Sequence, residues 1–331
     1  MKLINREKTI KKKKGYLYKI FKSIINDGFK ITVYKIANNI SFRRYKKISV
    51  HGNKMIVRTT NDGVSPTLIA YGKREVLETR IVKEYLRKNM VFFDLGANIG
   101  YYTLLGSSLI GLKGRCYALE PVPSNYKLLL RNIKLNKFND RVKCERIAIW
   151  DNIGLESFYI GKTQNVGTLL DLSSYGVKRN GIIKVKTITL DKYCNGFNRI
   201  DLLRMDIEGG EIKVINGMTN LLKQNVVKAI FTEMHPIGDI DPDPRFNPMI
   251  RKLLDSGFTA KYLISSNNPV SLKTFEKLKQ YPLEVADTGH GLFENIPSED
   301  LLKVAARRPK IARAIFFLHN SVSFSLGDVR L

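Results

Sequence analysis

The sequence predicts a doubly wound α/β domain with a mostly parallel sheet. From about residue 75 onwards, short apolar runs alternate with longer stretches whose apolar residues recur at helical spacing, which is typical of strands joined by crossover helices. A glycine-rich turn, Gly96 to Gly100, joins the first of these strands to a helix. With 44% hydrophobic and 26% charged residues, the 331-residue chain has the composition of an ordinary folded protein.

Each strand is expected where an apolar run is bounded by polar or turn-forming residues. The expected strands are Met90–Asp94, Arg115–Glu120, Arg141–Ile149, Lys184–Thr189, Leu202–Asp206, Val226–Met234, Phe258–Leu263 and, as the last, His290–Glu294. Helices are expected at Glu75–Lys88, Tyr101–Leu109, Ser124–Asn136, Glu211–Lys223 and Pro248–Ser256. The chain is therefore divided into a basic N-terminal extension (1–47), the α/β domain (48–297) and a helical C-terminal tail (298–331).

Positive charge is concentrated at the N-terminus. The net charge is +26, and residues 1–50 hold twelve Lys and three Arg against Glu7 and Asp27, which gives 15 − 2 = +13. We expect residues 1–47 to be partly disordered or helical. The apolar residues from Leu17 to Ile25 recur at helical spacing among lysines, so this segment either contacts an anionic membrane, packs on the main domain or remains a solvated arm.

Two further features limit the class of protein. No stretch approaches the roughly 20 apolar residues that span a bilayer, so we expect a cytoplasmic protein that is at most peripheral to a membrane. Cys116, Cys144 and Cys194 are widely spaced and form no C-x-x-C pair, which argues against a disulfide framework and against a structural zinc site. We expect all three to be buried thiols in strands.

The turn after the first strand is the strongest candidate for a functional site. The strand ends at Asp94, and Gly96 and Gly100 then allow a tight turn in the place where open α/β sheets bind ligands. Asn98 stands where a dinucleotide-binding turn needs its second glycine. A carboxylate at Asp94 also suits a cofactor with an ammonium and a sulfonium better than one with phosphates. The turn therefore favours S-adenosylmethionine over NAD.

A second acidic residue, Glu120, ends the next strand, twenty residues after Gly100. In other doubly wound cofactor sites, a carboxylate in this place accepts hydrogen bonds from the ribose hydroxyls. The alternative is a solvated charge at a strand end. The glycine turn before it favours the ribose role.

Two further strand ends carry pairs of polar side chains. If the extended chain continues to Glu208, Asp206 and Glu208 project from the same face. Two carboxylates so close require a proton, a cation or a substrate amine nearby, which disfavours a plain structural role. By the same alternation Glu233 and His235 share a face, and His235 is either a general base or a histidine satisfied by its neighbours. Glu211, in the first turn of the next helix, is expected to be structural.

Together, five motifs of this chain resemble those of FkbM-type methyltransferases. They occur in the expected order, cover about residues 70–236, and are preceded by Tyr71–Glu75, which resembles a Gly-x-x-Glu segment of those enzymes. Gly210 stands where the family more often has Ala, a change that should only loosen a helix start. The motifs are Phe93–Thr103; Leu119–Pro121 with Asn125, Ala148 and Asp151; Thr189–Asp191; Met205–Gly209; and Glu233–Pro236.

The resemblance implies a class I, Rossmann-like methyltransferase fold with seven strands. It also implies methyl transfer from S-adenosylmethionine, commonly to a hydroxyl of a sugar or another small molecule. As base for the acceptor hydroxyl, the candidates are Asp206, Glu208 and His235, in that order. The residues expected to bind the cofactor are Glu75, Asp94, Gly96, Asn98, Gly100, Glu120, Asn125 and Asp206.

Three alternatives stay open. No metal ligand is assigned, but Asp206, Glu208 and Glu233 could instead hold Mg²⁺ against the substrate oxygens. The basic charge suggests an RNA methyltransferase. However, Asp206 is followed by Ile-Glu-Gly, where adenine-amino methylases carry a Pro-Pro-aromatic motif, so the predicted partner is a small-molecule or glycan acceptor rather than nucleic acid. A non-catalytic module that binds the cofactor or a membrane is the third reading, and the retained carboxylates count against it.

Overall fold

The computed structural model describes residues 44–59, 64–161, 167–171, 173, 179–235, 245–305 and 311–327. The chain forms two compact units, residues 1–74 and 75–331, and the expected division at 47/48 stays a prediction. In the first unit, β1 (Tyr45–Val50) and β2 (Asn53–Arg58) form an antiparallel hairpin, followed by helix α3 (Ser65–Tyr71).

The membrane contact predicted for residues 1–47 stays a prediction, because the stretch from Leu17 to Ile25 lies outside the described residues. Within the described part of the chain, no helix is long and apolar enough to span a bilayer. All three cysteines are free thiols; Cys116 and Cys144 lie in strands as expected, whereas Cys194 follows a short helix.

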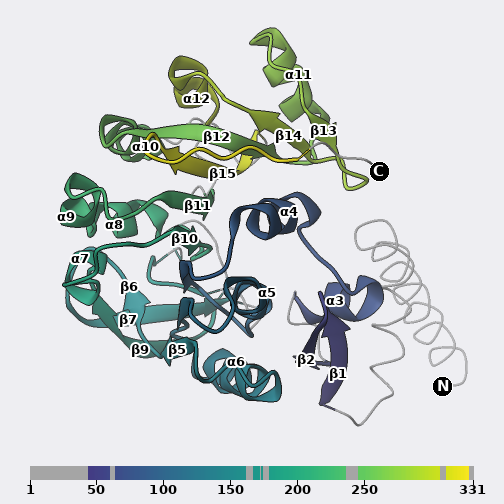
Figure 1. Ribbon diagram of the computed structural model, residues 1–331, viewed down its shortest axis with the longest axis vertical. Helices are drawn as coiled ribbons and strands as arrows, with labels where there is room; N and C mark the ends of the chain where they lie inside the picture. Colours follow the sequence, from purple (N-terminus) through teal and green to yellow (C-terminus); the bar gives the residue numbers. More distant parts are fainter. Residues whose placement is uncertain are drawn as a thin grey trace, which may run out of the picture. The chain divides into compact units, whose positions relative to one another are not determined.

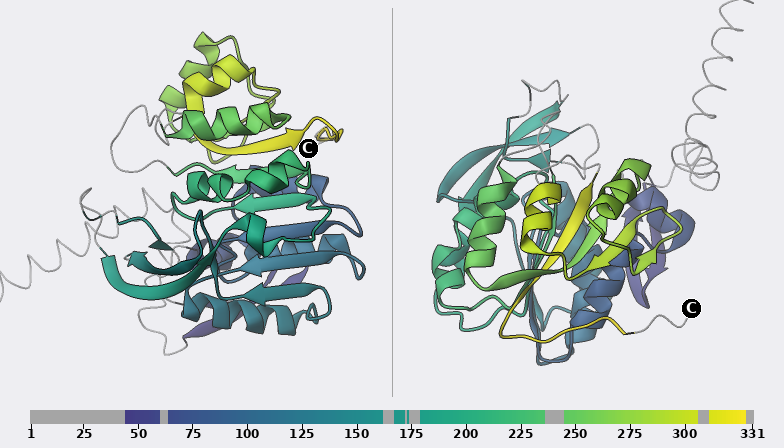
Figure 2. Two further views of the ribbon diagram at one scale, coloured as in Figure 1. Left: turned by 90° about the vertical axis from the view of Figure 1, so that its left-hand side faces the viewer. Right: turned by 90° about the horizontal axis from the view of Figure 1, so that it is seen from above.

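The second unit is built on a nine-stranded sheet in the order β13-β14-β12-β15-β11-β10-β3-β4-β5 (Figures 1 and 2). Strands β5, β4, β3, β10 and β11 are parallel, and β15 lies antiparallel between β11 and β12. The bounds are β3 (Val91–Leu95), β4 (Arg115–Leu119), β5 (Val142–Glu145), β10 (Leu202–Met205), β11 (Ala229–Glu233), β12 (Phe258–Ser265), β13 (Glu284–Val285), β14 (Gly291–Glu294) and β15 (Ala312–His319).

Helices cover both faces of this sheet, which confirms the doubly wound α/β class. Phe92 points towards α5, where a Cβ on Gly106 would lie 2.5 Å from its ring. Its neighbour Phe93 joins the opposite cluster with Ile215 and Met249. The helices are α4 (Val76–Tyr85), α5 (Tyr101–Ile110), α6 (Pro123–Leu135), α7 (Leu190–Tyr193), α8 (Glu211–Asn216), α9 (Thr219–Lys223), α10 (Phe246–Asp255), α11 (Pro269–Lys277) and α12 (Ser298–Ala305).

The C-terminal tail differs from the prediction of a helical segment. Helix α12 forms as expected, but residues 312–319 are β15, a buried strand inside the sheet, so His290–Glu294 does not contain the last strand. The run Ala-Arg-Ala-Ile-Phe-Phe-Leu-His is nearly continuously apolar, as in a strand buried on both faces, and therefore shows no alternation. With β13 and β14 at the edge, the sheet has nine strands rather than seven.

Two other expected elements are divided. The predicted strand at Arg141–Ile149 splits into β5 and β6 (Ala148–Ile149), and β6 belongs to a separate four-stranded sheet, β6-β9-β7-β8. The predicted helix at Glu211–Lys223 is interrupted at Gly217, which follows α8. The remaining strands of the small sheet are β7 (Gly154–Gly161), β8 (Gly167–Thr168) and β9 (Arg179–Ile188).

The strand order reverses between β3 and β10. From β3 the chain continues outwards to β4 and β5, whereas β10 and β11 pair on the other side of β3. The carboxyl ends of β3 and β10 therefore flank a topological switch point, the usual ligand position in such sheets. Here Gly96 has φ 77°, and a Cβ at this position would lie 2.1 Å from the backbone oxygen of Asp206. The glycine is needed for the close approach of the two strand ends.

We expect Gly96→Ala to lower the free energy of unfolding by about 2–5 kcal/mol, because backbone strain and overpacking each cost about 1–3 kcal/mol. The matched control is Gly196→Ala, where φ is 86° and a Cβ would meet nothing within 4 Å. That variant should lose only the backbone part, about 1–2 kcal/mol. Urea unfolding measures both, and equal losses would contradict the packing role of Gly96.

Candidate active site

Asp94 at the end of β3 is completely buried, and its charge is compensated inside the protein. Its Oδ2 accepts a hydrogen bond from Thr103 Oγ1 at 2.6 Å, and its Oδ1 accepts one from Arg204 Nη1 at 3.1 Å. Burial raises the pKa of Asp94, while Arg204 and Thr103 act in the opposite direction. Asp94 therefore holds Arg204 and helix α5 in place, and the contact with the cofactor expected for Asp94 stays a prediction.

Arg204 is the central cation of this region, and the sequence analysis did not single it out. It lies in β10 directly opposite Asp94 in the parallel register, and only 7% of its surface is exposed. Its Nη2 donates to Asp206 Oδ2 at 2.8 Å, and its guanidinium lies 4.0 Å from the centre of the Tyr102 ring. A charged residue in the middle of a buried apolar strand is itself a signal, because arginine is rarely buried without partners.

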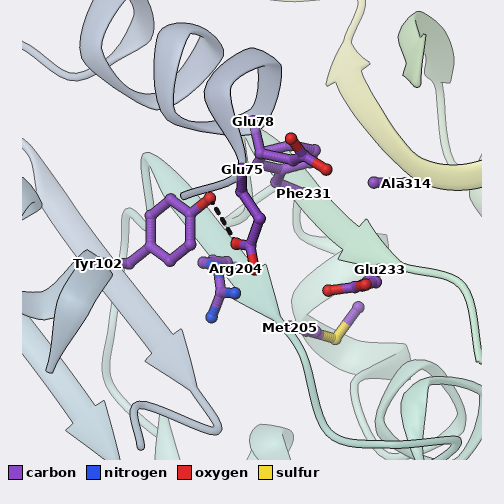
Figure 3. A pocket seen from close by; sticks show the side chains of 8 residues that line it. All are labelled: Glu75, Glu78, Tyr102, Arg204, Met205, Phe231, Glu233 and Ala314. Atoms are coloured by element: carbon purple, nitrogen blue, oxygen red, sulfur yellow. Dashed lines mark hydrogen bonds between the residues drawn. The ribbon is translucent and has the colours of Figure 1, made fainter. Parts of the chain in front are cut away.

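A small pocket opens between α4 and the carboxyl ends of β10 and β11 (Figure 3). Glu75, which has φ 49° and precedes α4, accepts a hydrogen bond from Tyr102 Oη at 2.9 Å. Three glutamates thus meet in one small space, as expected for a pocket that receives a cationic group. The lining residues are Glu75, Glu78, Tyr102, Arg204, Met205, Phe231, Glu233 and Ala314.

Arg313 of β15 partly balances these glutamates. Its Nε donates to Glu78 Oε1 at 2.8 Å, and its Nη2 lies 3.2 Å from Glu233 Oε1 and 3.7 Å from Glu75 Oε1. Burial and the nearby Asp206 nevertheless raise the pKa of Glu233 to about 8. The segment expected to be a helical tail therefore supplies a charge to the candidate site.

Glu120 follows β4 and is 4% exposed. Its Oε2 accepts from the Asn98 amide at 2.8 Å, and its Oε1 accepts from the Val122 amide at 2.9 Å and from Asn125 Nδ2 at 3.4 Å. These bonds tie the glycine turn to the end of β4. Asn98, Asn125 and Glu120, three of the residues expected to bind the cofactor, therefore lie in contact. A carboxylate offers about four lone pairs and three are used here, so Glu120 Oε2 can accept one further hydrogen bond, as from a ribose hydroxyl.

The affinity for S-adenosylmethionine should fall as the pH drops through about 7, because burial raises the pKa of Glu120 to about 7 and a protonated carboxyl accepts fewer hydrogen bonds from a ribose. Isothermal titration at about pH 6 and about pH 8 measures this step. Glu120→Gln, which shares every other titration, should bind more weakly without the step. An identical pH profile in both proteins would exclude the ribose role.

The same shift affects stability. The folded chain holds the proton of Glu120 more tightly than an unfolded chain with the ordinary pKa of 4.5. Ionisation of Glu120 therefore lowers the free energy of unfolding of the free protein as the pH rises from 4.5 towards 7. Above pH 7 the whole of this loss is present.

Asp206 and Glu208 lie close together beside the glycine turn, as expected, and His235 lies near both of them. His235 Nε2 lies 3.8 Å from Asp206 Oδ1, 3.7 Å from Glu208 Oε2 and 3.9 Å from Glu233 Oε1. The stated reason was wrong, however, because β10 ends at Met205 and Glu208 has φ 55°. A turn, rather than strand alternation, brings the two carboxylates together.

His235 is oriented by Glu211, a fully buried residue in the first turn of α8. The Nδ1 atom of His235 lies 2.8 Å from Glu211 Oε1. Glu211, which was expected to be structural, therefore contacts a candidate catalytic residue directly. Burial alone would lower the pKa of His235, but the carboxylates of Glu211, Glu208 and Glu233 outweigh it and hold the pKa well above its usual value. These carboxylates therefore favour the protonated form of His235. The assignment of the base among Asp206, Glu208 and His235 stays a prediction.

Comparison with known proteins identifies the family of this chain. The family model described as "Methyltransferase FkbM domain" matches residues 94–260. A hexuronic acid methyltransferase, AglP, of Haloferax volcanii is 26% identical over 173 residues, which cover 52% of this chain and 65% of that protein. A probable cobalt-precorrin-6B C(15)-methyltransferase (decarboxylating) of Sulfolobus acidocaldarius is 24% identical over 172 residues, which cover 49% of this chain and 88% of that protein.

Among solved structures, an S-adenosylmethionine-dependent O-methyltransferase of Thermotoga maritima has a TM-score of 0.38 at 11% identity, covering 83% of this chain and 77% of its own. A putative rRNA methylase of Clostridium thermocellum has a TM-score of 0.37 at 12% identity, covering 68% and 97%. The family match includes half of the sequence and contains the strand ends at Asp94, Glu120, Asp206 and Glu233. The chain belongs to the FkbM family of methyltransferases.

Proposed function

We propose that this chain transfers the methyl group of S-adenosylmethionine to a hydroxyl oxygen of a sugar or glycan. The position of Asp206 carries the proposal. Its carboxylate stands at the end of β10, and its backbone touches Gly96 of the cofactor turn, so a hydroxyl that contacts Asp206 lies beside the bound cofactor. The sugar class is supported by the Haloferax relative, whose name gives hexuronic acid as its substrate.

In the proposed reaction, the acceptor oxygen forms a bond to the methyl carbon while the carbon–sulfur bond breaks, and S-adenosylhomocysteine leaves. The hydroxyl proton passes to Asp206 or Glu208. Because the sulfonium already makes the methyl carbon electrophilic, alignment of the two reactants is the main task of the protein. Glu120 holds the ribose, the backbone from Gly96 to Gly100 approaches the cofactor, and the pocket at Glu75 receives the methionine end.

Purified full-length protein, incubated with S-adenosylmethionine and a panel of sugars and glycan fractions, tests this function. We expect S-adenosylhomocysteine to form together with a product heavier by one methylene group, and fragmentation to place that group on an oxygen. RNA and a mixture of small amines serve as competing acceptors. Methylation of RNA or of nitrogen alone, or failure to bind S-adenosylmethionine, would overturn the proposal.

A further inference from the structure

We propose that Asp206, Glu208 and His235 form a binding site for one divalent transition-metal ion, an inference that rests on the proposed function and specifies how the acceptor is held. Each residue offers one ligand atom, and these atoms all lie within 4.8 Å of one another. They come from the ends of two neighbouring parallel strands, β10 and β11, at the edge of the sheet where the acceptor binds.

The spacing of the ligand atoms suits an ion. His235 Nε2 lies 3.7 Å from Glu208 Oε2 and 3.8 Å from Asp206 Oδ1, which is too long for hydrogen bonds. Ligands about 2.1 Å from a shared metal lie about 3.0–3.4 Å from one another in octahedral or tetrahedral geometry. The two distances to His235 Nε2 therefore need to shorten by less than about 1 Å, and the largest separation in the set, at most 4.8 Å, by less than about 2 Å.

Glu211 supplies an independent observation. It is not among the three ligands, is completely buried, and accepts or shares a proton with His235 Nδ1 at 2.8 Å. A carboxylate on the far nitrogen is the usual partner of a metal-binding histidine, because it fixes the ring and directs Nε2 towards the ion. Glu211 Oε1 also accepts from the backbone amides of Gly209 and Ile207 at 3.3 and 3.4 Å, so one carboxylate fixes both the imidazole and the turn that carries Glu208. The other oxygen, Oε2, is buried with no hydrogen-bond partner among the described residues.

The ligand set indicates which ion binds. Glu233 lies 3.2 Å from Arg313 and belongs to the neighbouring pocket, so a site made of Asp206, Glu208 and Glu233 for Mg²⁺ is not favoured. One imidazole nitrogen and two carboxylates suit Mn²⁺, Fe²⁺ or Zn²⁺ better than Mg²⁺, which prefers oxygen ligands and water. Coordination positions left open by three protein ligands would take hydroxyl oxygens of the acceptor, orient them towards the methyl group and make them more acidic.

Chelator-treated full-length protein, titrated with Mn²⁺ and followed by electron paramagnetic resonance, tests the site. We expect one Mn²⁺ per chain, with pulsed spectra that show coupling to a single imidazole nitrogen. His235→Gln should remove that coupling and weaken binding at least tenfold, and Glu211→Gln, which keeps every ligand, should weaken it about tenfold. The control Glu294→Gln, remote from the site, should change the affinity less than threefold.

Two results would overturn the site: no Mn²⁺ bound by folded wild-type protein, or equal affinity and equal nitrogen coupling in wild type and His235→Gln. In either case His235 holds the carboxylates as an imidazolium. Titration with S-adenosylmethionine of the same chelator-treated protein separates this outcome from the proposed function. Cofactor binding without Mn²⁺ binding rejects the metal alone, and absence of cofactor binding rejects the function.

Discussion

Arg204→Met is expected to lower the free energy of unfolding by about 3–5 kcal/mol. The guanidinium is 7% exposed and contacts the carboxylates of Asp94 and Asp206, so its removal leaves a buried negative charge without its partner. Because the methionine side chain fills a similar volume, the measured loss of stability reports the removal of the charge and not the creation of a cavity. Urea unfolding measures the change, and Arg115→Met, at an exposed arginine, should cost less than about 1 kcal/mol.

The double variant Asp94→Asn, Arg204→Met distinguishes this explanation from a general packing defect. With both charges removed, stability should recover in part, because an uncompensated buried ion costs more than its replacement by a neutral group. In Arg204→Met alone the pKa of Asp94 should rise further above its ordinary value. Its stability should therefore fall more steeply than that of the wild type as the pH rises. An equal loss in the single and double variants, independent of pH, would exclude the charge explanation.

The fold was predictable from the sequence wherever the spacing of apolar residues indicated a single helix or a single strand. Strand β3 and the turn after it follow from an apolar run, Asp94 and two glycines. The pattern failed at β15, because a strand buried on both faces has no period by which to tell it from a helix. The prediction of one strand over residues 141–149 also failed, because this single stretch contributes to two different sheets.

The site was predictable at the strand ends but not across the sheet. Asp206, Glu208 and His235 meet because parallel strands place their carboxyl ends on one edge, which the strand order alone implies. The charged residues around them form ion pairs between positions that no local sequence motif connects. Arg204 pairs with Asp94 over a separation of 110 residues, and Arg313 pairs with Glu78 over 235. Such pairs depend on the register of the sheet, which a single sequence does not reveal.

Asp206→Asn is expected to reduce kcat by about 10²–10⁴-fold with the acceptor that the panel identifies, because a positioned base contributes a factor of that size. Asparagine keeps the shape and an oxygen that accepts from Arg204, so the fold should persist. Asparagine neither takes up a proton nor bonds a metal as a carboxylate does. The loss of kcat is therefore expected whether Asp206 acts as the base or as a metal ligand.

The affinity of Asp206→Asn for S-adenosylmethionine, measured by isothermal titration, should change far less than kcat, because Glu120 and the glycine turn supply the other cofactor contacts. Asp140→Asn, the same exchange at an exposed carboxylate paired with Arg141, should turn over like the wild type. If Asp206→Asn also turned over like the wild type, Asp206 would be neither base nor ligand. The reacting hydroxyl would then have to lie nearer to Glu208, which follows Asp206 in the turn after β10.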